Sequence, residues 1–188
     1  MYAGIFWIDA SFRGKLGVMV RPSGPKFLGI ELDVVKRKGA DILVSVIEDT
    51  EIHELGLEQE GEAAGDAGLA FIHHPIPDRD IPENFEHTFS LVKELAEEVR
   101  KGKNVVVHCR KSIGRSPMIV AAIMVWLGIS PKRAFQQIKK ARKTRVPDQP
   151  SQYDWVVEVE RRRIAEKKGK APSRRRRSFL SSLEAAFN

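Results

Sequence analysis

Apolar residues are arranged in two ways along the chain, because short continuous runs alternate with longer segments in which they recur every three or four positions. The runs predict strands buried inside a sheet, and the spaced segments predict helices that cover it. Strands are expected at 4–8, 15–20, 42–47, 69–76 and 104–108. Helices are expected at 29–38, 51–56, 58–68 (weakened by its glycines), 83–101, 115–127, 130–142 and 151–168. This alternation favours an α/β fold with a central, mainly parallel sheet flanked by helices.

Three of these helices carry further signals. The segment 115–127 is apolar on nearly every side, which predicts a helix buried in the core. Ser130, followed by Pro131, is expected to cap the start of the next helix, and Ser151 is expected to cap the last one.

The net charge of +7 is concentrated at the C-terminal end. Residues 161–188 contain ten Lys or Arg and two Glu, a formal charge of +8, so residues 1–160 sum to −1. A chain of 188 residues is long enough for one domain with a core and a tail. We expect a domain over 1–168 and a basic tail over 169–188, in which 178–187 could form a short amphipathic helix. Any nucleic-acid binding would depend on this tail.

Cys109 is the single cysteine, so an internal disulfide and a multi-cysteine zinc site are excluded. No segment approaches the roughly 20 apolar residues of a membrane-spanning helix. The apolar N-terminus lacks a basic leader and is interrupted by Asp9, and it is therefore interpreted as a first strand instead of a signal peptide. A free thiol without an export signal suggests a cytoplasmic location.

Residues 109–115 form a short loop between a buried strand ending at His108 and a buried helix starting at Arg115. Backbone N–H groups in such a loop point inward, and the positive end of the helix dipole faces the same place. Ile113 and Gly114 allow a tight turn into the helix. The loop therefore predicts a phosphate site, with the Arg115 guanidinium binding two phosphate oxygens.

Cys109 would lie at the floor of that site. Cations and helix N-termini lower the pKa of a thiol from about 8.5 to as little as about 3.5–7.5, so a nucleophilic thiolate is expected. The alternative is a small, buried hydrophobic cysteine. Its neighbours Arg110, Lys111, Ser112 and Arg115 argue against that, since they cannot all be buried without an anion.

The pattern His108-Cys109-x5-Arg115-Ser116 resembles the H-C-x5-R-[ST] loop of cysteine-dependent protein tyrosine phosphatases, particularly the compact dual-specificity branch. The segments HHPIPDRDIP and VPDQPSQYDWV also resemble this family, in the same order and at similar distances from the loop. The resemblance implies a phosphatase-type sandwich over 1–168 and metal-independent hydrolysis through a cysteinyl phosphate. It implies phosphate binding by the loop residues Arg110, Lys111, Ser112, Ile113 and Gly114.

One position departs from the family pattern, because Ser112 occupies a place where the family usually has glycine. If that position requires a positive φ, serine is strained there. If it does not, the hydroxyl could contact the phosphate or the thiolate.

The resemblance also implies roles for residues around the loop. An aspartate about thirty residues before the cysteine would protonate the leaving group and later activate water. Asp78, directly after a proline, is preferred over Asp80, and either could instead be a turn former. Ser116 would stabilise the thiolate as it leaves the intermediate, or simply satisfy a free backbone N–H. His108 would support the loop from behind.

A glutamine on a separate loop places the hydrolytic water in related enzymes. Gln149 and Gln152 are the candidates, and either could equally cap the last helix.

The first substrate expectation is phosphotyrosine in proteins, together with phosphoserine or phosphothreonine. Arg110 and Lys111 would also suit a more highly charged, non-protein substrate, such as an inositol phosphate, a phosphoinositide or an RNA 5′-phosphate. A phosphate-binding module without turnover is the alternative from another class. The basic tail is interpreted as a solvated segment or as a docking site for an anionic partner.

Overall fold

A single mixed sheet forms the centre of the protein. The computed structural model describes residues 4–169, so the expected helix at 178–187 and nearly all of the basic tail lie outside the described residues. The strand order is β1-β2-β5-β3-β4, in which β1 is antiparallel to β2 and the other neighbours are parallel. The strands are β1 (Phe6–Trp7), β2 (Leu16–Val20), β3 (Ile42–Ser45), β4 (Ala70–His73) and β5 (Val105–Cys109).

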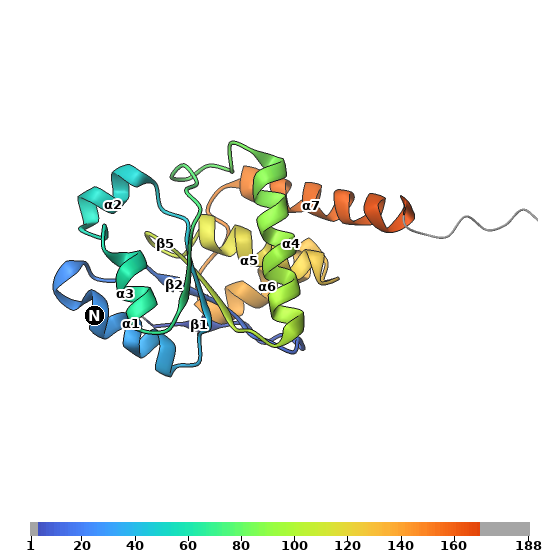
Figure 1. Ribbon diagram of the computed structural model, residues 1–188. Helices are drawn as coiled ribbons and strands as arrows, with labels where there is room; N and C mark the ends of the chain where they lie inside the picture. Colours follow the sequence, from blue (N-terminus) through green and yellow to red (C-terminus); the bar gives the residue numbers. More distant parts are fainter. Residues whose placement is uncertain (1–3, 170–188) are drawn as a thin grey trace, which may run out of the picture.

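Helices cover both faces of this sheet. The α-helices are α1 (Leu28–Arg37), α2 (Asp49–Leu55), α3 (Glu60–Asp66), α4 (Phe85–Lys101), α5 (Arg115–Trp126), α6 (Pro131–Arg142) and α7 (Pro150–Gly169), and η1 (Pro25–Phe27) is a short 3₁₀ turn. Figure 1 shows α1 and α3 on one side of the sheet and α4, α5 and α6 on the other. The predicted α/β sandwich with a mainly parallel sheet is therefore confirmed.

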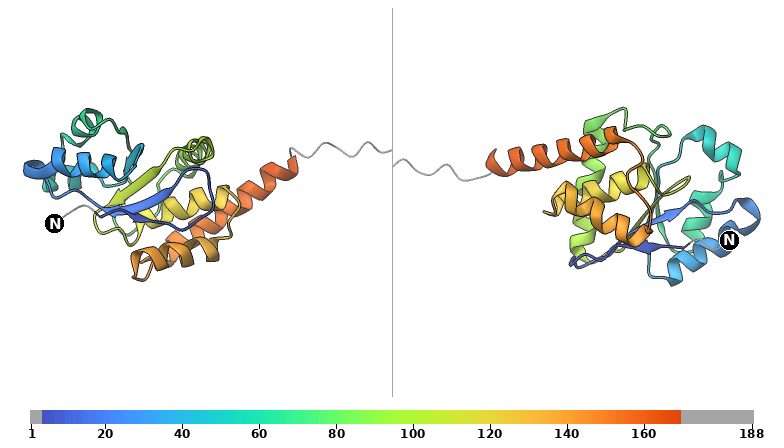
Figure 2. Two further views of the ribbon diagram at one scale, coloured as in Figure 1. Left: turned by 90° about the horizontal axis from the view of Figure 1, so that it is seen from below. Right: turned by 180° about the vertical axis from the view of Figure 1, so that it is seen from behind.

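The core is built around β5 and α5. Every residue of β5 is buried, because this strand has neighbours on both edges and helices on both faces. All residues of α5 from its start to Val125 are buried, as its uniformly apolar sequence predicts. The last turns of α7, in contrast, extend away from the rest of the molecule (Figure 2). Within residues 4–169, no helix combines the length and the apolar character needed to cross a membrane.

Two predicted helix caps differ from what is observed. Ser130 occupies the N-cap position of α6, but its side chain makes no capping hydrogen bond. The prediction for Ser151 is wrong, because α7 already begins at Pro150 and Ser151 is its second residue. Proline is well suited to the first helical position, since its fixed φ matches the helix and its missing N–H needs no partner there.

The topology brings three loops to one edge of the sheet. Strands β3, β4 and β5 are mutually parallel, so the segments that follow their carboxyl ends lie next to each other. These segments contain Glu51 after β3, Asp78 after β4 and Cys109 at the end of β5. The predicted reactive residues Asp78 and Cys109 therefore meet Glu51, which was not predicted, at a position where α/β proteins commonly bind ligands.

Candidate active site

Residues 109–115, which we call the phosphate loop, connect β5 to α5 and surround the Cys109 sulfur. Cys109 is buried, with 3% of its surface exposed. Its Sγ accepts a hydrogen bond from the Ser112 backbone N–H and another from the Ser116 hydroxyl, each at 3.3 Å. The sulfur thus has one donor from the loop and one from the first turn of α5.

Ser112 adopts a left-handed conformation, with φ of 58°. The position therefore does require the backbone conformation that favours glycine, and serine is strained there. The Ser112 side chain is fully buried, and its hydroxyl has no hydrogen-bond partner among the described residues. No contact between this hydroxyl and the Cys109 sulfur offsets the strain.

Gly114 is needed for space and not for backbone freedom, since its φ is −122°. A Cβ atom at this position would lie 2.1 Å from the Asp148 Oδ1 atom. The tight turn predicted for Ile113 and Gly114 is thus made by the left-handed residue before them. Glycine at 114 lets the Asp148 carboxylate approach the phosphate loop.

Arg115 begins α5 and its guanidinium is fixed by several partners. Nη1 donates to Glu51 Oε2 at 2.5 Å and to the Ile76 carbonyl oxygen at 3.0 Å. Nη2 donates to Glu51 Oε1 at 3.0 Å and lies 2.8 Å from Asp78 Oδ1. With 2% of its surface exposed, the Arg115 side chain is held in one orientation.

These contacts keep both partners of the Glu51–Arg115 pair ionised. Burial acts to lower the pKa of Arg115, but the hydrogen bonds with Glu51 and the charges of Cys109, Glu51 and Asp78 raise it above its usual value. Burial acts to raise the pKa of Glu51, but the hydrogen bonds from Arg115 and from the Glu48 backbone outweigh it and lower that pKa. The result is a charged guanidinium in a fixed orientation.

The capping box at the start of α2 links Arg115 to the Asp78 loop. Glu51 accepts a hydrogen bond from the Glu48 N–H at 3.0 Å, and the Glu48 side chain caps the helix in return. A Glu48 carboxylate oxygen also accepts a hydrogen bond from the Asp78 N–H at 3.0 Å. Glu48 therefore contacts the Asp78 backbone, and Glu51 contacts the guanidinium.

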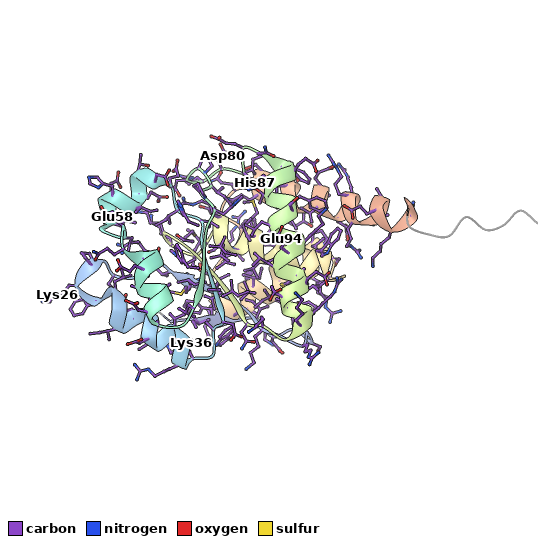
Figure 3. The ribbon with its side chains drawn as sticks, in the orientation of Figure 1. Lys26, Lys36, Glu58, Asp80, His87 and Glu94 are labelled. Atoms are coloured by element: carbon purple, nitrogen blue, oxygen red, sulfur yellow. The ribbon has the colours of Figure 1, made fainter. Side chains whose placement is uncertain are left out.

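Asp78 and Asp80 lie on the same loop, but they have different surroundings. The Asp78 carboxylate contacts Arg115 and lines the cavity above the phosphate loop. Asp80 does not line that cavity, and its carboxylate accepts a hydrogen bond from the N–H of Ile81 at 2.8 Å. Figure 3 shows Asp80 on the loop that leads into α4, near the end of that helix where His87 lies. Of the two aspartates, Asp78 is thus the one at the cavity, whereas Asp80 makes the local hydrogen bond of a turn former.

The cavity has a volume of about 550 Å³. Its cationic side chains are Arg79, Arg110, Lys111 and Arg115, and its carboxylates are Asp78 and Asp148. Ile113 is the apolar side chain of the lining, and no aromatic ring from the described residues contributes to it. Arg110 lies 3.3 Å from Glu54 and 3.7 Å from Glu51, so neighbouring acids partly neutralise it.

His108 lies behind the loop, fully buried. Its Nε2 atom is 2.9 Å from Glu60 Oε1, close enough for an ion pair but without the angle of a hydrogen bond. Glu60 is 2% exposed and belongs to α3, on the opposite side of β5 from α5. This position is consistent with a supporting role for His108.

The two glutamines are separated by the structure. Gln152 is buried, and its Nε2 atom donates to the Asp80 carbonyl oxygen at 3.2 Å. The same atom would lie 3.0 Å from a Cβ atom added at Gly114. Gln149 lines a different cavity, formed around Arg145 and Tyr153. Gln152 is therefore adjacent to the phosphate loop, whereas Gln149 is not part of the main cavity.

Sequence reasoning missed Glu51, Glu48 and Asp148 as parts of the site. One signal was available, because a buried arginine requires a buried anion and an acidic segment follows the predicted strand 42–47. The capping box of Glu48 and Glu51 was harder to foresee, because its first residue is Glu and not the usual Ser, Thr, Asp or Asn. For Asp148 the available signal was its place in the family-like segment VPDQPSQYDWV, next to the candidate Gln149.

Comparisons with known proteins agree with this geometry. Residues 19–129 match the family model described as "Polymorphic toxin system, DSP-PTPase phosphatase". Cyclin-dependent kinase inhibitor 3 of Rattus norvegicus is 28% identical over 93 residues, which is 48% of this chain and 43% of that protein. The matched region thus spans less than half the length of this curated relative.

Two solved structures share the fold. The kinase associated phosphatase, with its catalytic-site cysteine replaced by serine, has a TM-score of 0.76 and 19% identity, covering 88% of this chain and 98% of that one. Tk-PTP in its active form has a TM-score of 0.69 and 28% identity, covering 86% of this chain and 99% of that one.

The fold and the phosphate loop define a compact dual-specificity phosphatase domain of the protein tyrosine phosphatase superfamily. Within that class, the chain belongs to the DSP-PTPase phosphatase family of polymorphic toxin systems, whose model matches more than half of its residues.

Proposed function

We propose that this protein hydrolyses phosphomonoesters through a cysteinyl-phosphate intermediate. The observation that carries the proposal is the Cys109 sulfur, which accepts two hydrogen bonds at the floor of a cationic cavity that Arg115 also lines. A sulfur in this environment is suited to nucleophilic attack on phosphorus.

In the first step, the Cys109 thiolate attacks phosphorus, the bond from phosphorus to the leaving oxygen breaks, and Asp78 gives that oxygen a proton. Backbone N–H groups of the loop and the Arg115 guanidinium would stabilise the equatorial oxygens. The phosphate needs the Arg115 Nη2 group that Asp78 contacts at 2.8 Å. Substrate binding would therefore displace Asp78 from the guanidinium and leave it free to act on the leaving group.

In the second step, water attacks the cysteinyl phosphate, and Asp78 takes a proton from that water. The phosphorus–sulfur bond breaks, and the Ser116 hydroxyl stabilises the departing thiolate through its 3.3 Å hydrogen bond. Gln152, packed beside Gly114, is the better placed of the two glutamines to orient the water.

The experiment is hydrolysis of an aryl phosphate by three proteins: the wild type, Cys109→Ser and Arg115→Lys. Cys109→Ser should abolish turnover and still bind inorganic phosphate, whereas Arg115→Lys should weaken both. Full activity in Cys109→Ser would overturn the mechanism. Phosphate binding without turnover in the wild type would instead support a silent binding module.

Phosphoproteins, with phosphotyrosine first, are the proposed substrates, supported by the dual-specificity family membership. A polyanionic phosphomonoester is a second candidate, because Arg79, Arg110 and Lys111 line the cavity in addition to Arg115. Values of kcat/KM for phosphotyrosine and phosphothreonine peptides and for an inositol polyphosphate separate these classes. For the second candidate, Lys111→Gln should reduce the rate on the polyphosphate much more than on an aryl phosphate.

Two further parts of the proposal are the binding partner of the basic tail and the compartment of the protein. The charge of +8 on residues 161–188 supports docking of the tail on an anionic partner. The free thiol of Cys109 supports a reducing compartment, such as the cytoplasm.

A further inference from the structure

Arg142, the last residue of α6, contacts the phosphate loop from outside the cavity. Its Nε donates to the carbonyl oxygen of Ser112 at 2.9 Å, and its Nη2 donates to that of Lys111 at 3.2 Å. These two carbonyls belong to the peptide groups on either side of the Ser112 Cα. One guanidinium therefore holds both peptide groups that flank the left-handed residue.

The orientation of these carbonyls sets the orientation of two N–H groups. In a trans peptide the C=O and N–H bonds point in opposite directions. The Lys111 carbonyl points to Arg142, and the Ser112 N–H across the same peptide points to the Cys109 sulfur at 3.3 Å. By the same rule, the contact between Arg142 and the Ser112 carbonyl turns the Ile113 N–H away from Arg142. Successive N–H groups turned in this way form an anion-binding concavity.

Arg142 is itself held in place by β1. Its guanidinium carbon lies 4.1 Å from the centre of the Phe6 ring, within the range of a favourable cation–π contact. A cation is also favourable at the C-terminus of a helix. Burial lowers the pKa of Arg142 below its ordinary value, and the charge of Cys109 acts in the opposite direction.

We propose that Arg142, supported by Phe6, is a positioning residue that holds the peptide groups around Ser112 with their N–H groups toward the sulfur and the phosphate. Arg142 does not line the cavity, so it acts through the loop and not on the substrate. It offsets the strain of a non-glycine residue in the left-handed conformation. The expected effect of Arg142 on turnover rests on the proposed function. Its effects on the alkylation of Cys109 and on phosphate binding can be measured without turnover.

The experiment compares Arg142→Met, Arg142→Lys and Phe6→Leu with the wild type. The readouts are kcat for an aryl phosphate, the Kd of inorganic phosphate, and the pH dependence of Cys109 alkylation by iodoacetamide. Arg142→Met should lower kcat and weaken phosphate binding, each on the order of 10- to 100-fold, and should shift alkylation to higher pH. Arg142→Lys should resemble Arg142→Met, because one ammonium cannot reproduce the two-pronged contact. Phe6→Leu should change all three readouts less, in the same direction.

Ser112→Gly supplies the decisive background. Glycine adopts the left-handed conformation without strain. In the Ser112→Gly background, Arg142→Met should therefore raise the Kd of inorganic phosphate by less than about threefold. Arg162→Met is the matched control, because Arg162 also makes a cation–π contact. Arg162 lies on α7, and its guanidinium carbon is 5.1 Å from the centre of the Phe85 ring. Arg162→Met should leave all readouts unchanged.

Three results would overturn the proposal. They are an equal loss in the serine and glycine backgrounds, full rescue by Arg142→Lys, or unchanged phosphate binding and alkylation in Arg142→Met. If the wild type alkylates and binds phosphate as expected but hydrolyses no phosphomonoester, the proposed function fails while this inference is still tested. If Arg142→Met does not fold, Phe6→Leu in the two backgrounds provides the same comparison.

Discussion

Glu51 and Arg115, 64 positions apart in the chain, form a buried two-pronged ion pair. The same Glu51 carboxylate accepts the N–H of Glu48 and so completes the first turn of α2. The orientation of the Arg115 guanidinium, the proposed phosphate-binding group, therefore depends on the local structure of a helix that follows a different strand.

Replacing Glu51 should disable the site without removing any group that touches phosphate. In Glu51→Gln the guanidinium loses its fixed orientation, and kcat/KM for an aryl phosphate should fall on the order of 100-fold. Glu51→Ala should also lower the free energy of unfolding by about 3–5 kcal/mol, because a buried arginine loses its partner. Steady-state kinetics and urea denaturation measure the two effects.

Glu54→Gln is the control for this pair, since Glu54 is an exposed acid on the same helix that contacts only Arg110 among the charged loop residues. Its kcat/KM should stay within about twofold of the wild type. Equal losses in the two variants would mean that general negative charge matters, and not the orientation of Arg115.

Asp78→Asn should slow substrates according to their leaving groups. Loss of the general acid should reduce kcat by about 10²–10⁴ for alkyl phosphates and much less for nitrophenyl phosphate, whose leaving group needs little protonation. Asp80→Asn, on the same loop but outside the cavity, should retain near-normal rates. A larger, leaving-group-dependent loss in Asp80→Asn would reverse the assignment.

Ser112→Gly should stabilise the fold. The change removes about 1–2 kcal/mol of left-handed strain and a buried hydroxyl without a hydrogen-bond partner among the described residues. Glycine loses about 0.5–1 kcal/mol more entropy on folding, so a net gain of about 1 kcal/mol is expected in urea denaturation. Ser45→Gly is the control, because Ser45 is also buried without a described partner but lies in a strand, and it should lose stability. A loss in both variants would exclude strain at Ser112.

His74 should make stability depend on pH below neutrality. Burial, together with the charges of His87 and His73, lowers the pKa of His74 below its ordinary value of 6.5. Between that value and the lower folded pKa, the unfolded chain binds more protons than the folded one, so the stabilisation present above pH 6.5 is lost as the pH falls. The lowered pKa of Glu51 acts only below its ordinary value of 4.5.

Urea denaturation between about pH 7.5 and 5.5 measures this dependence. His74→Gln should flatten it, because the group with the lowered pKa is then absent. An unaltered slope in His74→Gln would show that another group is responsible.

Much of the fold could be predicted from the sequence, because local patterns determine its parts. The continuous apolar run before Cys109 and the all-round apolar helix after Arg115 have few alternatives to a buried strand and a buried helix. The loop between them is short, so the sequence places its two ends close together. Strand ends were harder, and β4 stops at His73 although the apolar pattern continues to Ile76.

The partners of the loop could not be predicted in the same way, because they come from distant parts of the chain. Arg142 reaches the loop only because α6 ends beside it, and no local pattern distinguishes this arginine from its neighbours. Glu51 required knowing that β3 and β5 are adjacent. The strain at Ser112 was left open because φ depends on the whole loop and not on the residue alone.

Whether Cys109 is the nucleophile can be tested by stopping a turnover reaction rapidly and locating the phosphoryl group by mass spectrometry. We expect one phosphoryl group, attached to Cys109 in the wild type and absent in Cys109→Ser. A phosphoryl group on another residue, or continued turnover in Cys109→Ser, would contradict it.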